Sequence, residues 1–391
     1  MSWNQQIVKV NNKSLVLQTI MDQGPLSRAD ISQKLGLTKG TVSSLVNEII
    51  AEKLCYETGP GESSGGRRPV MLSFNNSAGY SIGIDLGVNY ILGVLTDLEG
   101  TIVNEKKVAS HELSYDQTLS YMKNIIYYLL SNAPESHYGV VGIGIGVPGI
   151  VNKEGDILLA PNLGWKHINL KGDIENEFHL PIIIENEANA GAYGEKCFGA
   201  GREFQDIIYI SAGIGIGVGF ILNNELYRGT NGFSGELGHM IIEIDGKECK
   251  CGSKGCWELY ASEKALLKEC MDSLPENVEQ EYNLEFLLEQ IKENENIQLL
   301  MKKTGYFLGL GINNIINTFN PQQIIIGNRL AMAKDWMEDP MKEVINNYTL
   351  KQHQMDLQIT FAELSIYSSA LGVASYAAEN FLKTGVLPPA N

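Results

Sequence analysis

The spacing of the hydrophobic residues changes character near residue 75. Before that point apolar residues recur at helical intervals in two short segments, at Ile31, Leu35, Val42, Leu45, Val46, Ile49 and Ile50. Ser27 precedes Asp30 by three residues, as in a capping box, so the first helix is expected to begin there. Gly36 is placed to end it, and Thr38 to cap the next helix. Two short helices joined by a glycine-containing turn predict a helix-turn-helix.

Strand-like alternation follows at 55–58 and 70–74, around a Gly/Ser-rich stretch that carries Arg67 and Arg68. This pattern predicts a β-hairpin, the wing of a winged helix. The outward face of the second helix is expected to present Lys39, Thr41, Ser43, Ser44 and Asn47. Such short polar groups and a cation suit base edges and phosphates in a major groove, and an arginine pair suits a narrow minor groove. We expect residues 1–74 to bind DNA; a small helical domain with a solvated basic loop is the plainer alternative.

From residue 78 onward, apolar segments of strand length run into glycines. A strand is expected before a turn at Asp85–Gly87, and a second strand before a turn at Glu99–Gly100. The segment 207–222 is too short and too rich in glycine to span a membrane, and we interpret it as strand, tight turn, strand. Residues 368–382 have a helical pattern. Residues 262–303 are acidic and helical, and we expect them to form a solvated outer face without chemistry.

Length and charge limit the possible functions. A chain of 391 residues is expected to form two or three domains. Its net charge of −16 argues against a protein that coats nucleic acid or anionic membrane over its whole surface. Residues 1–74 hold eight Lys/Arg against six Asp/Glu, so this segment is +2 and the remainder −18. The start MSWNQQIVKV lacks the pattern of a signal peptide, and we expect a soluble cytoplasmic protein.

One cluster of residue types points to a metal. His239, Cys249, Cys251 and Cys256 supply one imidazole and three thiols within eighteen positions. This is a donor set for tetrahedral Zn²⁺, and four protein ligands leave no open position, so we expect a structural zinc. The plainer alternative is three reduced cysteines in a loop.

Several motifs together resemble the ROK family of repressors and sugar kinases along essentially the whole chain. They are the winged-helix pattern, Asp85-Leu86-Gly87, Gly146-Val147-Pro148-Gly149, Glu185-Asn186-Glu187-Ala188-Asn189, Gly235-Glu236-Leu237-Gly238-His239 and Cys249–Cys256. Within the family the chain is most similar to the xylose repressors of Gram-positive bacteria, through "SSGGRRPVML", "ENEANAGAYGEK", "GFSGELGHM" and "GCWELYASEKALLK". The resemblance implies an α/β fold, with a winged helix-turn-helix (1–74) followed by a two-lobed actin-like, RNase H-like fold. The first lobe would span 75–195, with a C-terminal helix at about 366–391 packed on it, and the second lobe 196–365.

The resemblance also implies a sugar site, whose residues would be Asn162, Asn186, Glu187, Glu236, His239 and Glu258. D-xylose would be the effector, and a homodimer would bind a palindromic operator of xylose-utilisation genes in double-stranded DNA. No membrane partner is expected. Amides and carboxylates can hydrogen-bond several sugar hydroxyls at once.

The nucleotide motifs depart from those of ROK kinases, which have aspartate at the position of Glu187. Their Asp-x-Gly-Gly-Thr motif stands here as Asp85-Leu86-Gly87-Val88-Asn89, and their second phosphate loop as Ser211-Ala212-Gly213. The late Gly-Gly reads Gly327-Asn328. Because phosphoryl transfer depends on positioning the phosphates, we expect no enzyme, no catalytic residue, and a Glu187 that only holds sugar. The alternatives are an active hexose or pentose kinase, a repressor that responds to glucose or a phosphosugar, and a winged helix that docks a protein.

Overall fold

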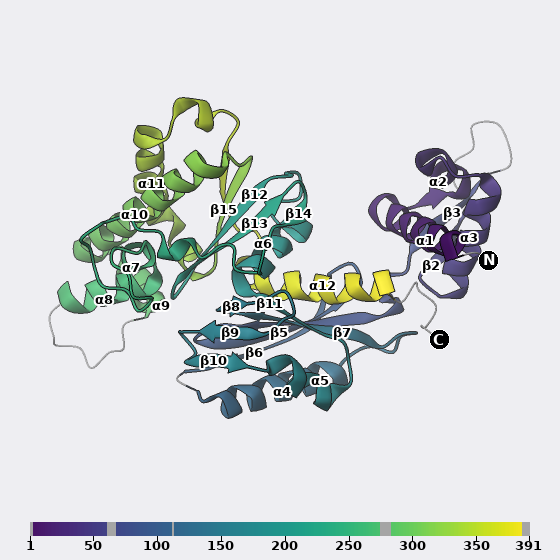
Figure 1. The fold of residues 1–391 in the computed structure, drawn as a ribbon, viewed down its shortest axis with the longest axis horizontal. Helices are drawn as coiled ribbons and strands as arrows, with labels where there is room; N and C mark the ends of the chain where they lie inside the picture. The colour runs from purple at the N-terminus through teal and green to yellow at the C-terminus, as the bar shows by residue number, and fades with distance from the viewer. Residues whose placement is uncertain (1–2, 61–67, 112, 274–282, 385–391) are drawn as a thin grey trace.

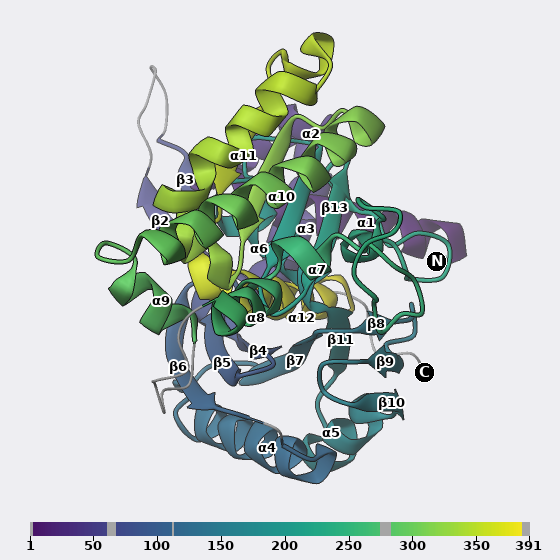
Figure 2. The same ribbon diagram turned by 90° about the vertical axis from the view of Figure 1, so that its left-hand side faces the viewer.

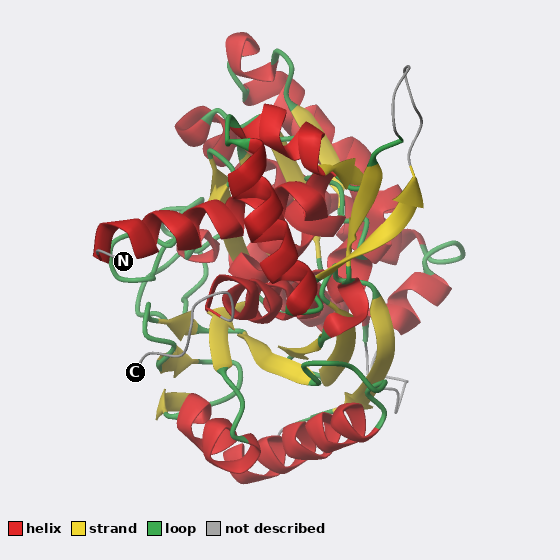
Figure 3. Ribbon diagram, turned by 90° about the vertical axis from the view of Figure 1, so that its right-hand side faces the viewer, coloured by secondary structure: helices red, strands yellow, loops and turns green. Residues whose placement is uncertain are grey.

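A computed structural model describes residues 3–60, 68–111, 113–273 and 283–384. At the N-terminus three helices cover a small antiparallel sheet of order β1-β3-β2 (Figure 3). The elements of this N-terminal unit are α1 (Trp3–Gln23), β1 (Leu26–Ser27), α2 (Arg28–Leu35), α3 (Lys39–Ala51), β2 (Cys55–Pro60) and β3 (Val70–Phe74). The capping box of Ser27 with Asp30 is confirmed, as are the left-handed Gly36 and the Thr38 cap. Arg67 lies outside the described residues.

The first lobe is built on a five-stranded sheet of order β11-β7-β4-β5-β6. Helices α4 and α5 cover one face of it and α12 covers the other (Figure 1). Its elements are β4 (Tyr80–Leu86), β5 (Tyr90–Asp97), β6 (Ile102–Ala109), α4 (Tyr115–Ser131), β7 (Val140–Val147), α5 (Leu170–Phe178), β11 (Ile182–Asn186) and α12 (Ser368–Thr384). A small antiparallel sheet lies beside it, with strands β8 (Ile150–Val151), β9 (Ile157–Ala160) and β10 (Trp165–Ile168). Asp85 and Leu86 end strand β4, so the turn comes slightly later than expected.

The second lobe is built on another five-stranded sheet, of order β14-β13-β12-β15-β16. Its strands are β12 (Ile207–Ala212), β13 (Ile216–Leu222), β14 (Glu225–Leu226), β15 (Gln323–Gly327) and β16 (Gln358–Phe361). Its helices are α7 (Glu258–Ala261), α8 (Glu263–Ser273), α9 (Leu284–Gln290), α10 (Glu295–Phe319) and α11 (Lys334–Tyr348), and the long pair α10 and α11 lies across one face (Figure 2). The strand, turn and strand expected at 207–222 are confirmed as β12 and β13.

One expectation for the second lobe was wrong. Residues 262–303 do not form only a solvated outer face, because Leu266, Leu284 and Met301 are buried in the core of the second lobe. Glu263 is also buried, and both of its carboxylate oxygens accept hydrogen bonds from Arg329. The many acidic residues of this segment led us to overlook the apolar residues that it buries.

Two helices lie between the sheets and cross closely. Helix α6 (Glu187–Phe198) packs on β12 and β13 of the second lobe, and α12 packs on β4 and β7 of the first. At the crossing a Cβ on Gly194 would stand 2.0 Å from the carbonyl oxygen of Ser368, and one on Gly372 would stand 1.9 Å from that of Ala190. Only glycine therefore fits at these two positions. Among the described residues, none of the helices combines the length and the hydropathy needed to cross a membrane.

Candidate functional site

Glu187 is the first residue of α6 and points its carboxylate at the second lobe. Ser211, the penultimate residue of strand β12, places its hydroxyl 3.0 and 2.8 Å from the two carboxylate oxygens. Asn328, which follows β15, donates its amide to Glu187 Oε1 at 3.4 Å and to Ser211 Oγ at 2.9 Å. Both partners come from segments that the sequence analysis placed at the nucleotide. Here their polar atoms are engaged with Glu187.

A second buried carboxyl faces the same spot. Asp85 accepts a hydrogen bond from the hydroxyl of Tyr90, while its other oxygen is buried without a hydrogen-bond partner among the described residues. Burial raises the pKa of Asp85 to about 6. Burial, and then the charge of Asp85, raise the pKa of Glu187 to about 8. The space left between the lobes here is about 10 Å³, lined by Asp85, Tyr90, Glu187, Tyr209, Asn328, Ser365, Ile366, Ser368 and Ser369. That volume suffices for about one water molecule.

A partly buried ion pair joins the lobes beside this small space. Glu185, at the end of β11, accepts a hydrogen bond of 2.7 Å from the Nε of Arg228, which follows β14 in the second lobe. The other carboxylate oxygen of Glu185 accepts from the Asn186 backbone N–H and the Asn189 amide, both at 3.0 Å. Sequence reasoning missed Arg228, because nothing local marks an arginine whose partner lies 43 positions away.

The structure brings some of the expected sugar residues together where the two lobes face each other, the region called the cleft from here on. A Cβ on Gly215 would lie 3.2 Å from Glu258 Oε2 and 3.6 Å from Asn162 Nδ2, so a residue of each lobe faces that glycine. The pKa of Glu236 is raised mainly by partial removal of its carboxyl from water. The charge of His239 lowers this pKa and that of Glu258 raises it, which places the three groups near one another.

Asn186 caps the N-terminus of helix α6. Its side-chain oxygen accepts from the backbone N–H groups of Ala188 and Asn189, at 2.9 and 3.1 Å, and so caps α6. Its amide donates to the carbonyl of Gly149 at 2.9 Å. One N–H of the amide is left for a ligand. Asn186 thus fixes the start of the helix that carries Glu187.

The four expected metal ligands converge. The donor atoms of His239, Cys249, Cys251 and Cys256 all lie within 4.8 Å of one another. Cys251 Sγ and Cys256 Sγ are 3.6 Å apart, and Cys249 Sγ is 3.7 Å from His239 Nδ1. With metal–ligand distances of about 2.0–2.3 Å, the edges of a tetrahedral zinc site measure about 3.5–3.8 Å. The two separations above match these edges, and the limit of 4.8 Å for all four donors exceeds them by about 1 Å, so a small adjustment of the side chains would seat the ion.

Glu258 connects this cluster with the cleft. Its Oε1 lies 3.6 Å from both Cys249 Sγ and His239 Nδ1, whereas its Oε2 faces Gly215. If Nδ1 of His239 is the metal ligand, only Nε2 remains for a sugar. A metal at this cluster would therefore fix the position of His239 next to Glu258, whose other carboxylate oxygen faces Gly215.

In the N-terminal unit, Lys39, Ser44, Asn47 and Arg68 are exposed, while Thr41 and Ser43 are half-buried. Arg28, which sequence reasoning missed, donates to the Asn47 side chain at 3.2 Å and pairs with Glu57 at 3.0 Å. Its position directly after the capping serine was the only available signal.

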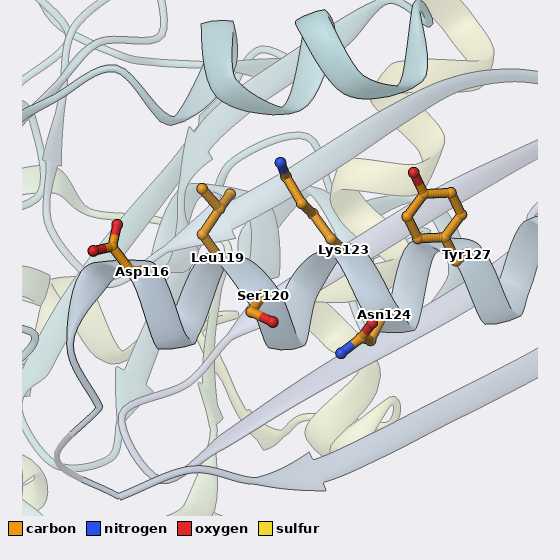
Figure 4. A pocket seen from close by; sticks show the side chains of 6 residues that line it. All are labelled: Asp116, Leu119, Ser120, Lys123, Asn124 and Tyr127. Carbon is orange, nitrogen blue, oxygen red and sulfur yellow. The ribbon is translucent and has the colours of Figure 1, made fainter.

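A wider surface hollow of about 270 Å³ lies elsewhere, along α4 (Figure 4). Its lining residues all come from that helix and are Asp116, Leu119, Ser120, Lys123, Asn124 and Tyr127. None of them was expected in a site, and the hollow lies on the face of the first sheet opposite α12. It has no part in the cleft.

Comparison with known proteins assigns the two-lobed body to a family. The model of the ROK family matches residues 81–380. The chain belongs to the ROK family. The first 80 residues of this ROK protein precede the matched region, and they contain the N-terminal unit.

Individual relatives include regulators and kinases. The chain is 44% identical to a xylose repressor of Bacillus subtilis (strain 168) over 380 residues, which covers 97% of this chain and 98% of the relative. It is similar to a solved ROK family transcriptional regulator, a homologue of the E. coli Mlc protein, with a TM-score of 0.81, 28% identity, and coverage of 97% and 98%. It is also similar to a ROK family glucokinase from Streptomyces griseus, solved with glucose and AMPPNP, with a TM-score of 0.70 and 28% identity. That match covers 77% of this chain and 99% of the kinase.

Proposed function

We propose that this ROK protein is a transcriptional repressor that binds a palindromic operator as a homodimer and is released by D-xylose. Similarity to a xylose repressor along 97% of the chain supports the regulator and the choice of sugar. In this proposal the sugar lies between the lobes, held by Asn162, Glu187, Glu236, Glu258 and His239, with Asn186 supporting them. Because the lobes contribute opposing polar groups, a bound sugar favours one relative orientation of the lobes.

The DNA-binding part is proposed to be residues 1–74, a winged helix-turn-helix. The arrangement of α2 and α3 followed by the hairpin β2–β3 supports this assignment, as does the basic balance of the segment. Helix α3 would lie in the major groove with Lys39, Thr41, Ser43, Ser44 and Asn47, while Arg67 and Arg68 reach the minor groove. The lobes are proposed to span 75–195, with the C-terminal helix at about 366–391 added, and 196–365.

The lack of space beside Glu187 favours a repressor over a kinase. We call this region, between Asp85, Tyr90, Glu187, Ser211 and Asn328, the filled corner. Tyr90 covers Asp85, and Ser211 and Asn328 hydrogen-bond to Glu187, which leaves about 10 Å³. A phosphoryl group needs several times the volume of one water molecule, together with donors that are free to bind it. These side chains would have to part before a nucleotide could enter, so we propose that the fold binds sugar without phosphorylating it.

A structural Zn²⁺ is proposed at His239, Cys249, Cys251 and Cys256. The ion would supply a rigid cross-link for the loop 240–257 and no chemistry. Its support is the fit of the donor distances to a tetrahedral site.

The test is fluorescence anisotropy on a labelled palindrome from upstream of xylose-utilisation genes, with D-xylose or D-glucose added. The proposal expects tight binding that xylose releases and glucose does not. Binding indifferent to xylose would contradict the choice of sugar, and absence of binding would contradict the repressor. A coupled ADP assay with xylose and with glucose covers the kinase alternative. Phosphorylation well above that of Glu187→Ala would overturn the proposal.

A further inference from the structure

Helix α12 begins at the filled corner between the lobes. Ser368 and Ser369, its first two residues, line the small space that Asp85 and Glu187 share. Glu195 of α6 anchors this end, because the wholly buried carboxylate accepts hydrogen bonds from the Ser368 hydroxyl at 2.7 Å and the Leu364 backbone N–H at 3.0 Å. The start of α12 is thus tied to α6, the helix that carries Glu187.

The middle of α12 packs closely on the strands of the first sheet. A Cβ on Gly83 of β4 would stand 1.9 Å from the carbonyl oxygen of Ala370, and one on Gly144 of β7 would stand 2.1 Å from that of Val373. Backbone lies directly on backbone at both places, so α12 cannot tilt or slide without moving the sheet. The 17 residues of the helix span about 25 Å at 1.5 Å per residue.

The far end of α12 points toward the N-terminal unit (Figure 1), and its apolar residues belong to a hydrophobic core that this unit shares with the first lobe. Ala378 and Leu382 share that core with Val16 of α1 and Val46 of α3. The ring of Phe381 packs against that of Tyr138, with centroids 4.8 Å apart. The Tyr138 hydroxyl donates to the backbone carbonyl of Glu52 at 2.8 Å.

Glu52 is the C-cap of α3, so Tyr138 joins α12 to the end of the proposed recognition helix. The segment between β3 and β4, which joins the N-terminal unit to the first lobe, is also fixed by hydrogen bonds. The Asn75 amide donates to the Lys53 carbonyl at 2.7 Å, and the Asn76 amide donates to Asp97 of β5 at 2.9 Å. The N-terminal unit, the first lobe and α12 therefore share one core and several hydrogen bonds.

We propose that α12 is the element that couples the cleft to DNA binding, and that the Tyr138–Glu52 contact passes the movement to α3. A sugar that changes the orientation of the second lobe shifts α6, and Glu195 passes this shift to the start of α12. Because α12 is packed tightly on the first sheet, it moves together with that sheet, and the Phe381 and Tyr138 contacts carry α3 along with them relative to the second lobe. The inference rests on the proposed function for its ligands, but the path consists of contacts in this chain. Coupling of this kind requires two arrangements that the sugar and the operator favour differently.

The test variant is Tyr138→Phe, which removes one hydroxyl and keeps the ring against Phe381. The control is Tyr127→Phe on α4, which also loses a hydroxyl bonded to a glutamate, Glu177, and keeps a ring contact with Phe178, but lies away from α12. We expect D-xylose affinity and sugar-free operator affinity to stay within about twofold in both variants. In Tyr138→Phe alone, the ratio of operator Kd with sugar to that without should fall about two- to tenfold, as expected for one hydrogen bond.

Hydrogen exchange gives a readout that does not depend on DNA. In the unaltered protein D-xylose should change amide exchange at 363–369, 377–382 and 48–54. In Tyr138→Phe the change at 48–54 should be lost while the other two remain. Exchange changes confined to the cleft in the unaltered protein would overturn the inference, as would a Kd ratio equal to that of Tyr127→Phe. If the unaltered protein binds no operator, the proposed function fails instead, and exchange alone decides the path.

Discussion

The buried carboxylate of Glu195 offers a direct test of how the lobes are joined. Its Oε2 accepts from the backbone N–H groups of Ala200 at 2.9 Å and Glu363 at 3.2 Å. Its Oε1 accepts from Leu364 N–H at 3.0 Å and from the Ser368 hydroxyl at 2.7 Å. Glu195→Gln preserves the shape but replaces one accepting oxygen with an NH₂ group that only donates.

The NH₂ group of the glutamine can replace either Oε1 or Oε2, and the two orientations differ in how much they destabilise the fold. An NH₂ group at the Oε2 position faces two backbone N–H groups, and both lose their acceptor. At the Oε1 position it faces the Leu364 N–H, whereas the Ser368 hydroxyl can turn and accept. The better seating therefore loses one hydrogen bond to a charged group, worth about 1.5–3 kcal/mol, and leaves one donor unpaired. Removing a buried charge offsets the weakening of the remaining bonds, so we expect a loss of about 2–3 kcal/mol in the free energy of unfolding.

Urea unfolding followed by circular dichroism measures this loss as a lower transition midpoint. Glu203→Gln, a surface change of the same type just after α6, is the control and should alter stability by less than about 0.5 kcal/mol. A Glu195→Gln midpoint equal to that of the control would refute the view that this carboxylate fastens α12 to α6.

Three further predictions concern the cleft, the metal and the DNA. Burial raises the pKa of Glu187 from 4.5 to about 8, so the folded state keeps a proton that the unfolded chain releases. Its contribution to stability is complete below about pH 4.5 and is lost as the pH rises through 8, and urea titrations should find a flatter pH dependence in Glu187→Gln. Purified protein should hold about one zinc per chain by elemental analysis, and Cys256→Ser should lose the metal and lower the Tm. Lys39→Ala should reduce the salt slope of operator binding by about 1, whereas Lys292→Ala in the second lobe should leave the slope unchanged.

Local chemistry allowed the elements to be predicted from the sequence. Ser27, Gly36 and Thr38 mark helix ends through bonds to near neighbours, and the structure confirms all three. The convergence of His239 with the three cysteines was predictable for a similar reason, because the ligands lie within a short loop. Signals of this kind need no knowledge of the tertiary fold.

Contacts between distant segments were not predictable in this way. Glu195 and Leu364 are separated by 169 positions, and Tyr138 and Glu52 by 86. The sequence around Glu195 or Tyr138 does not identify the hydrogen-bond partner of either side chain. A buried carboxylate or tyrosine hydroxyl can pair with any donor or acceptor that the fold brings near it. The role of Asn186 as a helix cap was missed for another reason: the motif drew attention to ligands, although Asn before a helix is also a common cap.

The core shared by α12, the first lobe and the N-terminal unit limits how freely the N-terminal unit can be replaced by that of another protein. Leu98, Val141, Ala378 and Leu382 are buried against the N-terminal helices. A fragment ending at residue 74 would expose the apolar surface that these residues cover, and a body starting at residue 75 would expose theirs. Joining this two-lobed body to a different N-terminal unit would therefore succeed only if the contacting surface of that unit matches these four side chains. The N-terminal unit and the two-lobed body are therefore constrained to change together.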